Sequence, residues 1–470
     1  MQRYKINKLI LLAGLLIFIT SCKKSFFTDL NNNPNVANSV TPNLLLPTIE
    51  TGLAYTQGGD ISRFSTLITQ QTFGAASQFQ NFYIYSYSTG AFDNLWADLY
   101  TTTMENDYTL MQSADDGHDN VYSGISRILM AYTLQITVDA FGDVPYSKAF
   151  QANKGGSLQP TYDKAQGLYD TAASLIDAGI SYLNNADPGG IVPSGDDLIY
   201  GGSAANWIKF AHAIKARLYI HQSKGNAAMA TNALNEIAQS FTSSSDNATY
   251  VFAGTATSEA PWYQFESGSR NGNVLFAFQS KGVPSPFAAL LISLHDPRYS
   301  IYLDSANDLS GQPAAPPATH YGGLNEYYGG IAAPVELITY DELLFATAEA
   351  TINAGGSSAD AQGFYQAAIT ANMQKLGVSA GNISTYLAAN GTLPVATSDA
   401  IAKIAQQEYI ALFLNPEAWT LWRRTGSPAL TPTTGSQIPR RFLYPSNEYT
   451  LNTANTPAST LYSPKVFWDN

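Results

Sequence analysis

Apolar residues recur every three or four positions along most of the chain, which is the spacing of one face of an α-helix. The clearest stretch covers residues 161–185, where apolar side chains keep this spacing over about six turns. A further helical pattern begins near Leu44. We therefore expect helices to dominate the fold.

The first predicted helix pair lies in the middle of the chain. Ser203 can cap a helix that carries Trp207 and Leu218, because its hydroxyl can accept a hydrogen bond from a free backbone N–H. Gly225 ends this helix, and a second helix is predicted over 227–240. Two helices of this length joined by a short turn have the size of a TPR unit.

A second predicted pair covers 335–353 and 359–376, with two glycines between the helices. Another helix is predicted over 401–414, after which Asn415 caps a short helix that ends at Gly426. Small and apolar residues follow TPR-like spacing in the second pair, although the full TPR signature is absent. We expect several such pairs to build an α-helical scaffold.

Long segments rich in Gly, Ser, Asn and Tyr separate the predicted helices, at roughly 72–92, 187–202, 242–275 and 305–333. Loops of this length in a compact domain are more often functional than idle. A helical scaffold would hold them in place for recognition. The predicted fold class is therefore all-α, with TPR-like helix pairs and long aromatic loops.

The N-terminus has the pattern of a secretory signal. Basic residues precede an apolar run over 9–19, and small residues then lead to Cys22. The run is shorter than the ~20 apolar residues that span a bilayer. Cys22 is the only cysteine and stands where a bacterial lipoprotein is cut, so we expect it to carry a diacylglyceryl anchor to a membrane. The alternative is an ordinary cleaved signal with a chance thiol.

The composition is acidic and poor in charge. The chain has 24 basic and 36 acidic residues; loss of residues 1–21 removes three basic ones and no acidic one, which leaves a net charge of −15. Because no basic patch stands out, we expect no nucleic-acid partner. Charged residues make up 13% of the chain and tyrosine is abundant, which suits recognition of neutral polar ligands. The alternative, which must hold for most rings, is that they are core.

Familiar catalytic motifs are absent from the sequence. There is no GxSxG nucleophile elbow, no phosphate-binding GK[ST] loop and no HExxH motif. We interpret His212 and His221 as structural. The segment 115–120 resembles a calcium loop without its final Glu, so a solvated turn is expected. We expect no metal and no cofactor, although a glycosidase needs only two carboxylates that meet in space.

Several short motifs occur in a fixed order over nearly the whole chain. They are Cys22 with Phe27–Leu30 and Asn33–Asn35, Phe141–Ser147 (FGDVPYS), Ser267–Asn273, Asp296–Arg298, Tyr340–Phe345, Ala348–Ala350, Pro416–Trp419, Trp422–Gly426 (WRRTG), Ile438–Arg441 (IPRR), Leu443–Pro445 and Phe467–Asp469. This set resembles the SusD/RagB family of outer-membrane lipoproteins, in particular its SusD-like subgroup with RRxG and IPRR motifs.

The resemblance implies an α-helical fold with four TPR-like units and a loop-rich face. It implies a lipoprotein signal peptide over 1–21, a lipidated tether over 22–43 and a single SusD-like ligand-binding domain over 44–470. Proteins of this family are binding proteins, not enzymes. They are anchored by lipid in the outer membrane at the cell surface, capture oligosaccharide or in some members peptide, and act as the lid of a TonB-dependent SusC-like transporter.

We expect the matched motifs to define the fold instead of contacting ligand. Phe141–Ser147 is predicted to pack a turn between elements. Arg423 and Arg424 are predicted to bond internal backbone or carboxylate partners, and Glu349 is predicted to face a helix groove.

The candidate ligand-binding residues lie in the aromatic loops. In an extended loop, alternation would put Tyr83, Tyr85 and Tyr87 on one side, in a region where the family has a ligand-contacting loop. The alternative is a buried short strand. The second loop carries Trp262, Tyr263 and Arg270, which could stack on a sugar and bond its hydroxyls, unless the Trp ring covers the core. Weaker candidates are Tyr321, Tyr327 and Tyr328.

Two alternatives of other classes stay open at this point. One is a TPR-type scaffold lipoprotein that binds only protein. The other is a glycan hydrolase whose carboxylates lie far apart in the sequence.

Overall fold

The computed structural model describes residues 40–74, 77–152, 155–185, 187, 189–267, 274–275, 278–280, 283–303 and 324–469. Nearly all of them belong to the unit Pro42–Asn470. Cys22, with the predicted signal peptide and nearly all of the predicted tether, lies outside them.

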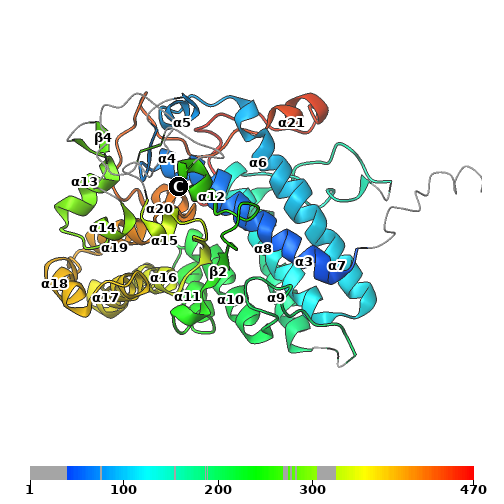
Figure 1. The fold of residues 1–470 in the computed structure, drawn as a ribbon, viewed down its shortest axis with the longest axis horizontal. Coiled ribbons are helices and arrows are strands. Elements are labelled where there is room, and N and C mark those ends of the chain that lie inside the picture. Colours follow the sequence, from blue (N-terminus) through cyan, green and yellow to red (C-terminus); the bar gives the residue numbers. More distant parts are fainter. Residues whose placement is uncertain are drawn as a thin grey trace, which may run out of the picture. The chain divides into compact units, whose positions relative to one another are not determined.

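Helices make up most of this unit, as expected. The α-helices are α3 Pro42–Tyr55, α4 Ser62–Ile68, α5 Ser77–Tyr83, α6 Asp93–Ala97, α7 Glu105–Gly117, α8 Asn120–Phe141, α9 Ala165–Asn184, α10 Ala204–His221, α11 Ala227–Ile237, α12 Pro261–Ser267, α13 Pro286–Ser293, α14 Tyr299–Tyr302, α15 Glu326–Gly329, α16 Tyr340–Asn353, α17 Ser358–Lys375, α18 Ala380–Asn390, α19 Thr397–Ala411, α20 Glu417–Thr425 and α21 Ser446–Leu451. The helices α9, α10, α11, α16 and α17 lie side by side in one row (Figure 1). The prediction of TPR-like pairs is therefore confirmed.

Two of the helical runs contain π-helical turns. The segment η1 (Thr56–Ile61) joins α3 to α4, and η3 (Asp98–Met104) joins α6 to α7, in both cases without a break in right-handed helical geometry. In η1, a Cβ atom on Gly58 would stand 2.3 Å from Val335. Glycine is therefore required where this turn meets the neighbouring strand.

The strands are few and short. They are β1 Phe73–Gly74, β2 Ala248–Val251, β3 Val274–Leu275, β4 Phe278–Ser280, β5 Val283–Pro284 and β6 Pro334–Ile338, and short 3-10 helices lie at η2 (Thr89–Phe92) and η5 (Ser244–Asp246). The pairs β1–β3, β2–β6 and β4–β5 are all antiparallel. None of them forms a sheet of more than two strands among the described residues.

The structure corrects some predicted boundaries. The helix predicted over 335–353 begins only at Tyr340, because residues 334–338 pair with β2 as strand β6. The predicted loop 72–92 contains β1, α5 and η2. Local caps act as predicted: Ser203 Oγ accepts from Asn206 N, and Asn415 Oδ1 accepts from Glu417 N.

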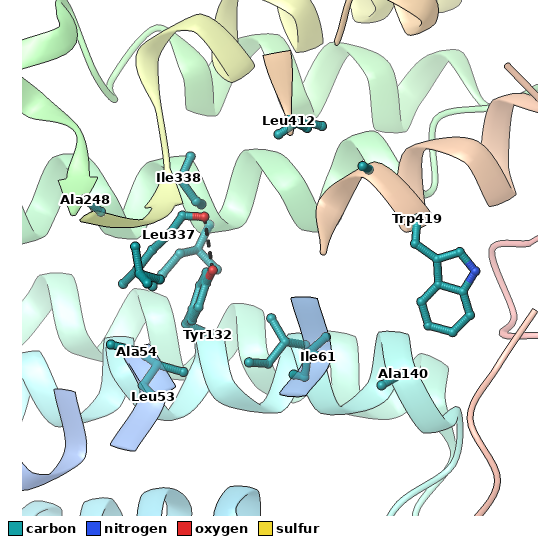
Figure 2. Close-up of a cluster of buried hydrophobic side chains, with 14 of the residues drawn as sticks. Leu53, Ala54, Ile61, Tyr132, Ala140, Ala248, Leu337, Ile338, Leu412 and Trp419 are labelled. Carbon is teal, nitrogen blue, oxygen red and sulfur yellow. Dashed lines mark hydrogen bonds between the residues drawn. The ribbon is translucent and has the colours of Figure 1, made fainter. Parts of the chain in front are cut away.

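The core centres on α8, whose residues are buried all round the helix. Tyr132 of this helix donates its hydroxyl to the carbonyl of Leu337 at 3.0 Å, among the side chains of Leu53, Ile61 and Ile338 (Figure 2). The hydrogen bond joins α8 to β6, and Leu53 of α3 and Ile61 of η1 pack beside it. The N-terminal helices and strand β6, far apart in sequence, thus share one core.

Candidate ligand-binding site

The first aromatic segment is not extended. Helix α5 covers Ser77–Tyr83, and the chain then turns at Tyr85, whose φ is +61°. Tyr83 and Tyr85 are only 8% and 6% exposed, and the Tyr85 hydroxyl accepts from Thr433 N. Burial, with a smaller effect of Tyr85, raises the pKa of Tyr83 to about 12. The predicted extended loop is therefore wrong. The segment is helical up to Tyr83, and the rings of Tyr83 and Tyr85 pack against the protein interior instead of lining an exposed side.

Tyr87 also belongs to this packed layer. Its ring stacks on Phe82 at a centroid distance of 5.1 Å and on Phe92 at 5.5 Å. Its hydroxyl is buried and has no hydrogen-bond partner among the described residues. Burial therefore raises its pKa well above the ordinary value.

The second aromatic segment lies on helix α12. Trp262 is 5% exposed and donates Nε1 to Ser62 Oγ at 3.0 Å, so its ring covers the core. Tyr263 beside it is half-buried. Arg270 lies outside the described residues, as does Tyr321. Tyr327 donates to Glu336 Oε1 at 2.9 Å, and Tyr328 is buried.

The structure brings the two predicted segments together around Arg63 of helix α4. We define the Arg63 cluster as Arg63 with the rings of Phe64, Phe79, Phe82 and Phe265. The guanidinium carbon lies 5.8 and 5.5 Å from the centroids of Phe79 and Phe82, and 5.4 Å from that of Phe265. Contacts of this length are cation–π interactions. Strand pairing of β1 with β3 further ties the two segments together.

Sequence analysis missed Arg63, although a signal was present. Residues 61–68 form an otherwise uncharged helical stretch, and Arg63 is its single charged side chain. A lone cation in such a stretch indicates a specific partner. The Arg63 Nη2 atom lies 2.9 Å from Asp60 Oδ1, which supplies the compensating charge.

The solvent side of α5 carries uncharged polar groups. We define the α5 face as the exposed side chains of Gln78, Gln80, Asn81 and Ile84. Each amide offers both donors and an acceptor. Ile84, 40% exposed, adds an apolar contact. Such a surface can bond a neutral polar ligand, while the Arg63 cluster fixes the helix that carries it.

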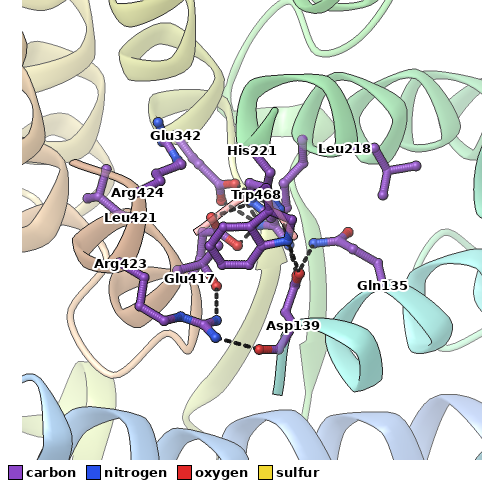
Figure 3. A network of polar contacts seen from close by, with 12 residues as sticks. Gln135, Asp139, Leu218, His221, Glu342, Glu417, Leu421, Arg423, Arg424 and Trp468 are labelled. Carbon is purple, nitrogen blue, oxygen red and sulfur yellow. Dashed lines mark hydrogen bonds and ion pairs between the residues drawn. The ribbon is translucent and has the colours of Figure 1, made fainter. Parts of the chain in front are cut away.

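A second group of titratable side chains lies deep in the core (Figure 3). The ligand atoms of Asp139, His221 and Glu417 lie within 4.8 Å of one another, as in a metal site. However, His221 Nε2 already pairs with Glu417 Oε1 at 2.8 Å, and its Nδ1 with the Tyr169 hydroxyl at 2.8 Å. Because the imidazole nitrogens are already bonded, we interpret the group as a structural network, as predicted for His221.

Opposing effects set the charges in this network. Burial raises the pKa of Asp139 above its ordinary value. Burial alone would raise the pKa of Glu417 as well, but His221 and Arg217 together hold it below its ordinary value. The network thus favours the ionised form of Glu417 in the core.

The arginine motif joins the network to the C-terminus. Arg423 donates Nη1 to the carbonyls of Asp139 at 2.6 Å and Arg440 at 2.9 Å. Arg424 forms a buried ion pair with Glu349. The prediction that these motif residues bond internal partners is confirmed.

The FGDVPYS motif also has a structural role. Asp143 Oδ1 accepts from Ala165 N at 2.9 Å and so caps α9. Asp163 Oδ2 in return accepts from the backbone N–H groups of Tyr146 and Ser147. The predicted packing of a turn between elements is confirmed. Segment 115–120 contains the end of α7, the left-handed His118 that follows it, and the first residue of α8.

Membrane spans were sought among the described residues. Within them, no helix combines the length and the apolar character needed to cross a bilayer.

A family model described as "Starch-binding associating with outer membrane" matches residues 34–445. The chain belongs to this SusD-like family. A search of curated proteins found no match.

Solved structures show the same fold as this SusD-like chain. A SusD/RagB family protein from Bacteroides thetaiotaomicron is 22% identical, with a TM-score of 0.71, over 92% of this chain and 99% of the other. A chitin-binding protein is 22% identical with a TM-score of 0.73, over 92% and 100%. A Bacteroidetes SusD-like protein, AC2a, reaches a TM-score of 0.74 at 19% identity over the same shares. SusD-like proteins bind nutrients in association with the outer membrane.

Proposed function

We propose that this SusD-like protein captures oligosaccharide at the cell surface and closes as a lid over a TonB-dependent SusC-like transporter. The observation that carries the proposal is the Arg63 cluster, which fixes two distant aromatic segments beneath an uncharged face. The family description names starch, and one structural neighbour is named for chitin. Both favour a glycan over a peptide as the ligand.

The ligand-binding region consists of the two predicted segments. Tyr83, Tyr85, Tyr87 and Trp262 form its base, since their rings are packed inward. Tyr263, Arg270 and the amides of the α5 face supply contacts to the ligand. Hydrogen bonds from neutral amides suit sugar hydroxyls, which carry no charge to be matched.

The anchor is a lipid on Cys22. Export and lipidation would leave the rest of the chain in water, tied to the outer membrane and displayed at the cell surface. The protein acts by binding, and any cleavage of the glycan belongs to separate enzymes.

Affinity purification from mild-detergent extracts tests the proposal. With a C-terminal tag, a large TonB-dependent barrel should co-purify in near-stoichiometric amount. Recovery of soluble proteins alone would favour a TPR-type scaffold. Release of shorter glycans by the purified protein would instead indicate a hydrolase.

A further inference from the structure

A cleft of about 570 Å³ lies between α6, η3, the 145–152 segment and α21. It shares no residue with the α5 face or the Arg63 cluster. Its size falls in the range of roughly 300–1,000 Å³ that is typical of small-molecule sites. Aromatic rings line one wall and polar side chains line the rim.

The aromatic wall is a row of rings. Trp96 and Tyr100 have centroids 4.6 Å apart, and Tyr100 and Phe150 stack at 6.1 Å. Behind the wall, Tyr108 stacks on Phe150 at 5.5 Å. Tyr100 and Phe150 remain half-buried, so part of each ring faces the cleft. Such faces bind the C–H groups of sugar rings.

Phe150 is held in an unusual conformation. Its φ is +59°, in the left-handed region that bulky residues rarely adopt. Backbone strain of this kind persists only where the surroundings enforce it, and it is concentrated at functional sites. In this conformation the ring stacks on Tyr100 and completes the wall.

The wall is built before any ligand arrives. The Tyr100 hydroxyl donates to the carbonyl of Pro145 at 2.7 Å. The Pro145 turn is in turn held by Asp163, which accepts from Tyr146 N at 2.8 Å. A preformed wall spares a ligand the entropy cost of ordering it.

The rim is polar and carries three acidic side chains, Asp93, Glu105 and Glu448, and one basic side chain, Lys148. Asp93 already accepts from Ser446 N at 2.7 Å, and Glu448 from the Tyr162 hydroxyl at 2.7 Å. Of the lining charges this leaves Glu105 and Lys148, which are opposite in sign and have no hydrogen-bond or ion-pair partner among the described residues. The exposed amide of Asn447 adds a donor and an acceptor.

Leu158 closes the rim on the side of α21. It is 84% exposed, although the next residue is fixed: Gln159 donates Nε2 to the carbonyl of Leu451 at 2.8 Å. An apolar side chain held in water at the mouth of an aromatic cleft adds surface that a ligand can cover.

We infer that this cleft is a second glycan-binding site, which takes a neutral oligosaccharide. A sugar ring lies against Phe150 and Tyr100, and its hydroxyls bond Lys148, Glu105 and Asn447. The excess of acidic side chains on the rim disfavours an acidic glycan. An apolar peptide is disfavoured because it would bury the side chains of Glu105 and Lys148 without partners. The inference goes beyond the proposed function and needs no transporter.

Calorimetric titration of the purified mature chain tests the site. The probes are maltohexaose, cellohexaose, the chitin hexasaccharide, hexagalacturonate and the peptide Ala-Leu-Ala-Leu-Ala-Leu. Ala97→Trp places a large ring in the cleft from an exposed position of α6. Phe150→Ala removes one of the three rings of the wall. Ala228→Trp, at an exposed position of α11, is the matched control.

We expect at least one neutral hexasaccharide to bind. Each cleft variant should weaken the affinity for this hexasaccharide at least tenfold. If the wild type shows two binding events, each cleft variant should instead lose one of them. The control should leave the affinity unchanged. Co-purification of the transporter should persist in Ala97→Trp, which separates this site from the lid function. Three results would each overturn the inference: no neutral hexasaccharide binds, neutral binding is equal in wild type and Ala97→Trp, or only the acidic glycan or the peptide is blocked by Ala97→Trp.

Discussion

Arg217 of α10 and Glu342 of α16 form a two-pronged ion pair inside the protein. Arg217 Nε and Nη2 each donate to a different carboxylate oxygen at 2.8 Å, and the two side chains are 3% and 5% exposed. Nη2 also donates to the carbonyl of Leu337 at 2.9 Å. The pair therefore joins two TPR-like helix pairs to strand β6.

Breaking this pair should destabilise the scaffold strongly. We expect Glu342→Ala to lower the free energy of unfolding by about 3–5 kcal/mol, because it removes both hydrogen bonds to the buried Arg217 charge and leaves Glu417 Oε2, at 3.7 Å from Arg217 Nε, as the nearer acid. Chemical denaturation measures the change. Asp170→Ala, at an exposed position inside α9, should cost less than about 0.5 kcal/mol. The double variant Arg217→Met/Glu342→Leu should recover much of the loss, and a further loss would contradict this account.

A buried carboxyl in α7 should make stability depend on pH. Asp107 is fully buried, and neither of its oxygens has a hydrogen-bond partner among the described residues. Burial raises its pKa well above the ordinary value of 3.8, and Arg127 opposes this only in part. Since the folded pKa exceeds the unfolded one, the stabilising contribution of the neutral acid is present below pH 3.8 and is lost as pH rises through the folded pKa.

Asp107→Asn cannot ionise, so it should match the wild type near pH 4 and be more stable at pH 8. We expect a gain on the order of 1 kcal/mol. Thermal melts at both pH values measure the difference. Asp170→Asn, at an exposed position inside α9, is the control for the substitution itself. An equal effect of Asp107→Asn at both pH values would show that the carboxyl does not titrate in this way.

Arg63 should matter for ligand binding beyond its effect on stability. Arg63→Met removes its cation–π contacts and the ion pair with Asp60, at a cost of about 1–2 kcal/mol. Hydrogen exchange in 77–85 should rise and glycan affinity should fall. The matched control is Arg127→Met, which removes a guanidinium 4.3 Å from the Tyr182 centroid. If both variants reduce affinity equally, the Arg63 cluster has no special role in binding.

The α5 face should contribute hydrogen bonds to the glycan. We expect Asn81→Ala and Gln80→Ala each to weaken binding roughly threefold to tenfold, since a hydrogen bond contributes about 0.5–1.5 kcal/mol. Both residues are exposed, so the melting temperature should not change. Asn235→Ala on α11 serves as the exposed control for calorimetry. Unchanged affinity in both α5 variants would move the ligand away from this face.

Cys22 should carry the membrane anchor. Cys22→Ser removes the thiol that accepts lipid, so metabolic labelling with a fatty acid should disappear and the protein should leave the membrane fraction. Cys22 is the only cysteine, so loss of label can be assigned to this one position. Persistent labelling of the serine variant would contradict lipidation at residue 22.

The helical scaffold followed from local patterns. The 3.6-residue spacing in 161–185 and the cap at Ser203 involve residues within a few turns of one another, so no distant contact was needed to predict α9 or the start of α10. The motif roles of Arg423, Arg424 and Glu349 also followed, because a charged side chain within a fold-defining motif needs an internal partner.

Local patterns failed where a distant partner decides the conformation. Residues 334–338 have an apolar content that suits a helix or a strand, and pairing with β2 selects the strand. Tyr83 and Tyr85 are held in part by Thr433, nearly 350 residues away, which donates its hydroxyl to the Tyr83 carbonyl and its N–H to the Tyr85 hydroxyl. The spacing of three tyrosines cannot contain that information.

The chain by itself therefore determined the long helices of the scaffold, the residues that carry the family pattern and the segments where aromatic side chains are concentrated. Tertiary packing alone decided which faces of those aromatic residues meet solvent. It placed Phe265 against Arg63, about two hundred positions earlier, and set Phe150 beside Tyr100. Burial and ring stacking depend on contacts between distant segments, and these exist only once the helices have packed.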